Sequence, residues 1–178
     1  PALANSIVGE IWPQEVEVGI DTTFTYTVAV GGGNGFNRLE IATTAPVRAI
    51  HSLTIDGEAA AIVDSELRED GLAIEFERLT GDRTLQVEFD TSVLRYETVF
   101  SGQLRDTTRA GSLPQAVESG DATGDLAGTD LSVRVPLGGS DLVHAVAVSP
   151  ATFSPNGDGV NDETTITYDL LHLTDPVP

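Results

Sequence analysis

The stretch FSPNGDGVNDETTITYDL, residues 153–170, concentrates oxygen-bearing side chains on a turn that precedes an alternating segment. Calcium takes six to eight oxygen ligands from carboxylates, amides, backbone carbonyls and water. The middle of the stretch reads N-x-D-G-x-x-D, which matches the spacing of a calcium-binding loop. We therefore predict a Ca²⁺ site with these ligands: Ser154, Asn156, Asp158, the backbone carbonyl of Val160, Asp162 and Thr165.

The ends of this loop depart from the EF-hand pattern. Ser154 stands where an aspartate is usual, Thr165 stands where a bidentate glutamate is usual, and the flanking segments are not helical. A related site without helices fits better, with Asn161 or Glu163 as replacement ligands. The alternative is a polar turn without metal. Crowding of Asp158, Asp162 and Glu163 favours a cation, because a cation would relieve the repulsion among three like charges.

Other chemistry has little support in the sequence. Asp121, Asp125 and Asp130 could form a second cation site or a hydrolytic carboxylate pair, but no aromatic or apolar residues surround them, which favours a solvated loop. The chain has no Cys, so it has neither disulfides nor thiolate ligands. No nucleophile, base and orienting group can be assembled from it. We therefore predict that the protein is not an enzyme.

The charge balance restricts the partners. The chain has 28 acidic residues against nine basic ones, all of them Arg, and a formal net charge of -19. Such a charge repels nucleic acid and anionic membranes, and no apolar run reaches the roughly 18 residues of a membrane span. The acidity is consistent with a salty or calcium-containing exterior, and the absence of Lys is consistent with GC-rich coding. We expect a secreted or cell-surface protein that binds no nucleic acid and inserts in no membrane.

Apolar residues alternate with polar ones along much of the chain. This period of two is typical of strands with one buried and one solvated face, as in antiparallel sheets. The clearest apolar sets are Phe24, Tyr26, Val28 and Val30; Leu72, Ile74 and Phe76; Leu85, Val87 and Phe89; Leu131, Val133, Val135 and Leu137; and Ile166, Tyr168 and Leu170. Eight or more short strands with regular turns predict an all-β protein, an antiparallel β-sandwich of Ig-like or cohesin-like type.

Several short segments are expected to connect these strands. Asp-Gly in IDGE (55–58) and EDGL (69–72) is a strong hairpin signal. We expect GGGNG (31–35) and TGDR (80–83) to be turns between separate strands. The aperiodic segment 106–130 is expected to be a long covering loop with a partly paired segment around 113–117.

The near-continuous apolar segment LVHAVAV, residues 142–148, is typical of a strand buried on both sides, and we expect it to close a first domain over residues 1–148. SPATFSP (149–155) carries two prolines and is expected to be a stiff linker. Residues 149–178 would then form a calcium-loop linker and the first strand of an incomplete second Ig-like module.

The motif at 153–170 resembles the opening of the Ig-like modules of flagellar hook-capping proteins. It also resembles the C-terminal sorting or anchoring domains of bacterial type-nine-secreted surface proteins. Those modules begin with a Pro-Asn-Gly-Asp-Gly-x-Asn-Asp turn and continue into an I-x-Y-x-L strand, which Ile166, Tyr168 and Leu170 match. The likeness covers residues 149–178 and implies an extracellular, multi-modular bacterial protein. Residues 1–148 share only a general likeness with bacterial Ig-like and cohesin-like sandwiches.

These patterns favour a non-catalytic structural or adhesion module in which Ca²⁺ stiffens an inter-domain turn. Its partners would be neighbouring modules or subunits of the same protein. One alternative is a self-assembling extracellular filament or surface-layer subunit that donates the strand 166–170 to a neighbour. Another is a module that binds extracellular glycan or protein through residues 31–35 or 106–130.

Overall fold

The computed structural model describes residues 2–136, 143–155, 157 and 162–170. The chain divides into two compact units, Pro1–Pro136 and Leu137–Pro178. All regular elements in the described part of the chain are strands. Within that part no helix is long and apolar enough to cross a membrane. The all-β prediction is therefore confirmed.

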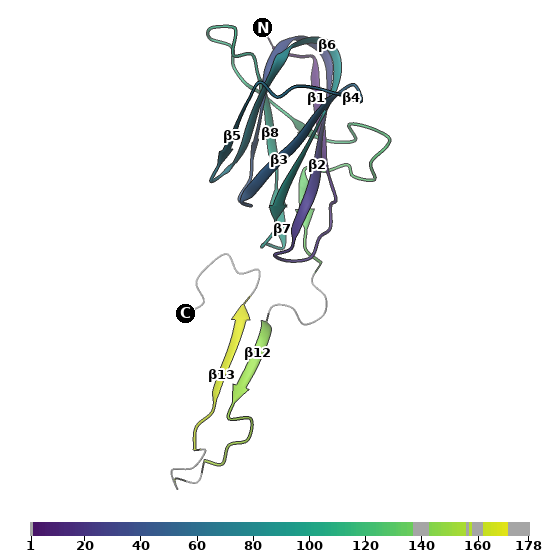
Figure 1. The fold of residues 1–178 in the computed structure, drawn as a ribbon. Coiled ribbons are helices and arrows are strands. Elements are labelled where there is room, and N and C mark those ends of the chain that lie inside the picture. The colour runs from purple at the N-terminus through teal and green to yellow at the C-terminus, as the bar shows by residue number, and fades with distance from the viewer. Residues whose placement is uncertain (1, 137–142, 156, 158–161, 171–178) are drawn as a thin grey trace. The chain divides into compact units, whose positions relative to one another are not determined.

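The first unit contains eleven strands (Figure 1). They are β1 (Ser6–Trp12), β2 (Asp21–Ala42), β3 (Val47–Ile55), β4 (Glu58–Ala59), β5 (Asp64–Arg68), β6 (Gly71–Ser92), β7 (Glu97–Val99), β8 (Ser101–Arg105), β9 (Gln115–Ala116), β10 (Glu118–Ser119) and β11 (Ser132–Arg134). The segment around 113–117 is paired as predicted, because β9 pairs with β8.

Two of these strands are much longer than the sequence indicates. Gly31–Gly35 and Thr80–Arg83 lie inside β2 and β6 respectively, so the prediction of turns there is wrong. Gly33 pairs with Gly81, and the register shifts on both sides of Gly33. A Cβ on Gly33 would lie 2.8 Å from the Gly81 carbonyl oxygen, so two glycines let the strands bend together at close approach.

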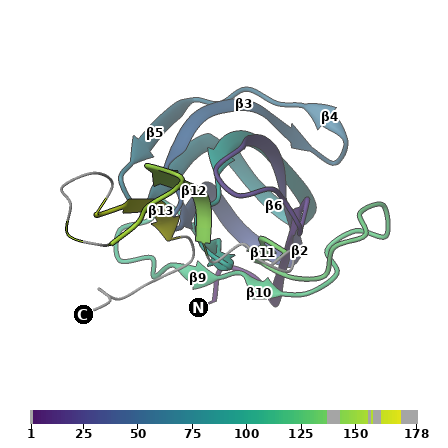
Figure 2. The ribbon, with the colours of Figure 1, turned by 90° about the horizontal axis from the view of Figure 1, so that it is seen from below.

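Because β2 and β6 bend, each contributes to two layers of the sandwich. The first layer has the order β10-β1-β2-β6-β3-β4 and uses residues 21–30 of β2 with 83–92 of β6. The second layer has the order β9-β8-β2-β6-β5 and uses residues 38–42 with 71–75. Figure 2 shows β3 and β5 on one side of the first unit and β9 and β10 on the other.

The core lies between the two layers. The inward side chains of β2 and β6 are fully or almost fully buried, as the alternation predicts. Phe24, Phe89 and Phe100 form its aromatic centre, with ring centroids 5.8–6.2 Å apart. Aromatic contacts of this kind add about 1 kcal/mol each to the area that they bury.

The two Asp-Gly hairpins differ. Asp56 and Gly57 connect β3 to β4 with φ values of 53° and 84°, as a type I′ turn requires, which confirms the prediction. In the second hairpin Arg68 pairs with Gly71, so Glu69 and Asp70 form the turn and the glycine opens β6.

The second unit contains one antiparallel hairpin of β12 (Val143–Ser149) and β13 (Thr165–Leu170). β12 was expected to close the first domain and β13 to be the first strand of a second module, but the two strands pair with each other. Val146 and Val148 are exposed, so the prediction of a strand buried on both sides is wrong for these residues. The division between the units precedes β12, whereas the sequence predicts a boundary after residue 148.

Candidate functional site

The predicted calcium loop connects β12 to β13 and lies within the second unit. Of its six predicted ligands, Ser154 is exposed, Asp162 is half-buried, and Thr165 opens β13 opposite Ser149. Asn156, Asp158 and Val160 lie outside the described residues.

Two hydrogen bonds shape the described part of this loop. The Gly157 N–H donates to Asp162 Oδ1 at 2.8 Å, so the carboxylate is held across the loop. The Thr164 hydroxyl donates to the Pro150 carbonyl oxygen at 2.8 Å, next to the Ser149–Thr165 pair. Among the residues that the structure describes, no three His, Asp or Glu side chains converge as a metal site would require. The predicted ligand Asp158 is not among these residues, because it lies outside the described part of the chain.

The hairpin also carries exposed apolar side chains. Val148 and Ile166 are directly opposite each other, so their side chains share a face. Val146 and Tyr168 lie two residues further along their strands, and all four are 44–58% exposed. An isolated two-stranded hairpin is marginally stable in water. Covering this apolar face would therefore stabilise it.

In the first unit, charged side chains gather on the outer face of the second layer. Residues opposite one another in neighbouring strands place their side chains on the same face. From β5 to β8 three such rows cross the layer: Asp64, Glu75, Arg38 and Arg105; Glu66, Ala73, Glu40 and Gln103; and Arg68, Gly71, Ala42 and Ser101.

Arg38 is the centre of these rows. Its Nε donates to Glu40 Oε1 and its Nη1 to Glu75 Oε1, both at 2.7 Å, and its Nη2 donates to Glu66 Oε2 at 3.2 Å. Burial alone would raise the pKa of Glu40, but hydrogen bonds from Arg38 and Gln103 lower it overall. The carboxylate therefore stays ionised with its partners.

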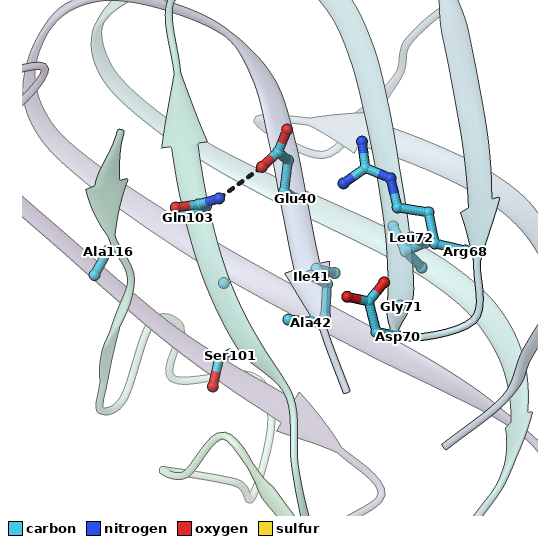
Figure 3. A pocket seen from close by; sticks show the side chains of 11 residues that line it. Glu40, Ile41, Ala42, Arg68, Asp70, Gly71, Leu72, Ser101, Gln103 and Ala116 are labelled. Carbon is cyan, nitrogen blue, oxygen red and sulfur yellow. Dashed lines mark hydrogen bonds between the residues drawn. The ribbon is translucent and has the colours of Figure 1, made fainter. Parts of the chain in front are cut away.

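The third row forms a hollow on this face. Gly71, Ala42 and Ser101 are too small to fill the space, which leaves a hollow of about 380 Å³ between Arg68 and Asp70 on one side and Gln103 on the other (Figure 3). Gln103 Nε2 donates to Glu40 Oε2 at 2.6 Å along its rim. A second hollow of about 430 Å³ shares Ala42, Asp70 and Ser101 and continues past Arg95 and Glu97.

Sequence reasoning missed this hollow. The charges at alternate positions of residues 38–40 and 64–68 mark an outward polar face, but their cross-strand partners depend on the pairing of distant strands. The hollow offers guanidinium donors, carboxylate acceptors and hydroxyls within one small volume, which is the chemistry that recognises a polar ligand.

The three aspartates of the covering loop do not act together. Asp130 has a structural role, because its Oδ1 accepts from the Ser119 hydroxyl and the Leu131 N–H, and its Oδ2 accepts from the Ser132 hydroxyl. Burial alone would raise the pKa of Asp130, but these hydrogen bonds lower it. Asp121 and Asp125 are exposed.

The fold thus defines an all-β sandwich with a separate hairpin unit. No protein-family model matches the chain. A search of curated proteins likewise gives no match.

Proposed function

We propose that this chain is a non-catalytic structural module of a secreted or cell-surface, multi-modular bacterial protein. Its sandwich would be of the Ig-like or cohesin-like type. Ca²⁺ would bind the loop between β12 and β13 and brace that hairpin. The bracing would act within the second unit, because the loop lies inside this unit.

The observation that carries this proposal is the closure of the acidic loop at its base. The Ser149–Thr165 pair and the Thr164–Pro150 hydrogen bond join its two ends, and Asp162 already accepts a bond across it. A loop with fixed ends has less entropy to lose when it wraps an ion. Ion binding to the loop would therefore stabilise β12 and β13 together.

The apolar face of the hairpin supports a role in assembly. Val146, Val148, Ile166 and Tyr168 would be covered by a neighbouring module or subunit, which would gain stability by removing them from water. Strand addition at the hairpin is the form of this contact that would build a filament. The net charge of -19 supports an acidic, soluble module without nucleic-acid partners.

Hydrogen exchange of the amides in β12 and β13 tests the proposal. In the full chain, Ca²⁺ should slow exchange in both strands by at least about tenfold relative to chelator, in line with a modest linkage free energy. Asp162→Asn should abolish this effect, whereas Asp64→Asn, a change of an exposed carboxylate on β5, should preserve it. Equal exchange with Ca²⁺ and with chelator would contradict the proposal.

The hollow of the second layer favours a second candidate function, the binding of a polar extracellular ligand such as a glycan. Its donors and acceptors come from Arg68, Asp70 and Gln103. A glycan array with the wild type and with Asp70→Asn would test this function. Glycan binding that is unchanged by the substitution would exclude the hollow as the binding site.

A further inference from the structure

A buried carboxylate lies on the outer face of the first layer. Glu10 is on β1, and the side chain of its neighbour Ile11 is buried in the core. The Glu10 side chain points away from the core. Glu10 is nevertheless 0% exposed, because the chain after β10 folds over it. The Gly120 N–H donates to the Gly9 carbonyl oxygen at 3.0 Å and ties this cover to β1.

Only one oxygen of this carboxylate has hydrogen-bond partners. Glu10 Oε1 accepts from the Thr123 N–H at 2.9 Å and from the Thr123 hydroxyl at 3.1 Å. Glu10 Oε2 is buried and has no partner. Thr27 Oγ1 is also buried without a partner, and Thr27 is directly opposite Glu10 on β2. Side chains of directly opposed residues share a face. Two unpartnered oxygens therefore occur in one cross-strand pair.

The charge near this pair is negative. Burial raises the pKa of Glu10, hydrogen bonds from Thr123 and a weaker backbone interaction with Ala122 oppose the rise, and the charge of Asp121 adds to it. No arginine is among the strongest influences on this pKa. An isolated buried carboxylate is costly, so the site requires a compensating species.

A proton or a water molecule compensates only in part. A proton on Oε2 would create a buried O–H donor, and Thr27 Oγ1 is not hydrogen-bonded to it. A bridging water would supply hydrogen bonds but leave the charges of Glu10 and Asp121 unbalanced. A calcium-sized ion lies about 2.3–2.6 Å from each oxygen ligand, so it can contact two oxygens that are too far apart to bond each other.

We propose that Glu10 Oε2, Thr27 Oγ1 and the Asp121 carboxylate form a cation site in the first unit, for a hard divalent ion of the calcium class. Water and backbone carbonyls of the covering chain complete its shell. This site is separate from the loop between β12 and β13. Its ion fastens the covering chain to the outer face of the first layer.

Trp12 provides a local probe. It is the only Trp of the chain and lies two residues from Glu10 on the same face of β1, at a rise of about 7 Å. Tb³⁺ occupies oxygen-rich calcium sites and emits when a nearby indole is excited. Excitation at the red edge of the absorption, where Tyr contributes little, reports ions close to Trp12. The experiment uses the full chain with Asp162→Asn, which weakens the hairpin loop as a competing site.

The expected result is saturable, Trp-sensitised Tb³⁺ emission that excess Ca²⁺ reverses. Glu10→Gln should abolish the emission, and Thr27→Val should weaken Tb³⁺ binding by at least about tenfold. Glu58→Gln, which neutralises an exposed carboxylate on β4, should leave it unchanged. Glu10→Gln removes a buried charge and keeps the shape of the side chain, so this variant should fold. Circular dichroism checks the folding of Glu10→Gln and Thr27→Val.

Three outcomes would overturn the proposal. They are the absence of saturable emission in the parent protein, emission that persists in folded Glu10→Gln, and equal loss of emission in Glu58→Gln. The first would assign the space to water or a proton. The other two would place the ion elsewhere on the surface.

Discussion

The hydroxyl of Tyr26 occupies the space in which Gly102 would carry a side chain. A Cβ built on Gly102 would lie 2.2 Å from the Tyr26 Oη and 3.1 Å from its Cζ. Tyr26 is on β2 and Gly102 is on β8, and both are buried on the inner side of the sandwich. The largest buried side chain of the core is therefore matched to the absence of one on the facing strand.

This match predicts an energetic coupling. Gly102→Ala should destabilise the protein by about 2 kcal/mol through overpacking. In a Tyr26→Phe background the cost should fall by about 1 kcal/mol, because the atom in closest conflict is gone. Urea denaturation of the four proteins of the cycle measures the coupling. Gly124→Ala, at a position with open space, should show no coupling to Tyr26→Phe. Strict additivity at Gly102 would show that the two groups do not meet.

A second glycine permits the close approach of β6 and β2. Gly71 has φ 142°, and a Cβ there would lie 1.9 Å from the Ile41 carbonyl oxygen. We expect Gly71→Ala to cost at least about 3 kcal/mol, because both strain and a backbone clash result. Gly57→Ala is the matched control: it has φ 84° but open space, so strain alone should cost about 1 kcal/mol. Thermal unfolding should show a larger loss of stability for Gly71→Ala than for Gly57→Ala. Equal losses would show that the backbone clash at Gly71 adds nothing to the strain.

The period of two was enough to place the inward residues of β2 and β6, and the Asp-Gly dipeptide was enough to place the hairpin at Asp56–Gly57. It could not show that residues 31–35 and 80–83 bend two continuous strands. Glycine-rich segments serve in both turns and bulges, and here the difference lies in the pairing of Gly33 with Gly81, which are distant in the sequence. The same limit hid the partner of β12.

The candidate sites also differ in whether their residues are close together in the sequence or come from distant strands. The acidic loop is visible in the sequence because its ligands are local. The Arg38 rows, the hollow beside them and the Glu10–Thr27 pair each join strands from different parts of the chain, so single-strand patterns do not reveal them. Asp130 shows the same limit: its loop was expected to be solvated, whereas this carboxylate accepts hydrogen bonds from Ser119, Leu131 and Ser132.

Arg38 should be the most important cation of the outer face. Its side chain is only 12% exposed and faces three carboxylates. Arg38→Gln should therefore cost about 2 kcal/mol, since it leaves like charges together with few donors. Arg68→Gln removes an exposed arginine of the same face and should cost no more than about 0.5 kcal/mol. Chemical denaturation compares them, and similar small losses would mean that solvent screens the Arg38 network.

Asp106 should make the free energy of unfolding fall as the pH is lowered into the acid range. Hydrogen bonds from Thr108 lower its pKa most, burial opposes them, and Arg78 lowers it further. The folded state therefore holds the proton more weakly than the unfolded state. Its contribution is present above the unfolded-state pKa and is lost as pH falls through the lower, folded-state pKa. Asp106→Asn should be less stable at neutral pH and should lose less stability on acidification below about pH 4. Parallel pH profiles of the two proteins would exclude this role.

Truncation tests the boundary between the units. All members of the hydrophobic core cluster of the first unit come before residue 136. A chain ending at Pro136 should therefore keep the melting temperature of the first unit within about 2 °C. A chain ending at Val148 should melt alike, and β12, without β13, should exchange its amide hydrogens freely. A large loss of stability in the shorter chain would assign β12 to the sandwich.

The continuous strands β2 and β6 have a consequence for how the protein is made. They pair along both halves, so the segment 43–70 must close as a loop before β2 and β6 can join in either layer. A growing polypeptide thus cannot pair its two long strands along their whole length until residue 92 has left the ribosome. During that interval β2 lacks its longest cross-strand partner, and formation of the two-layered core awaits the second long strand.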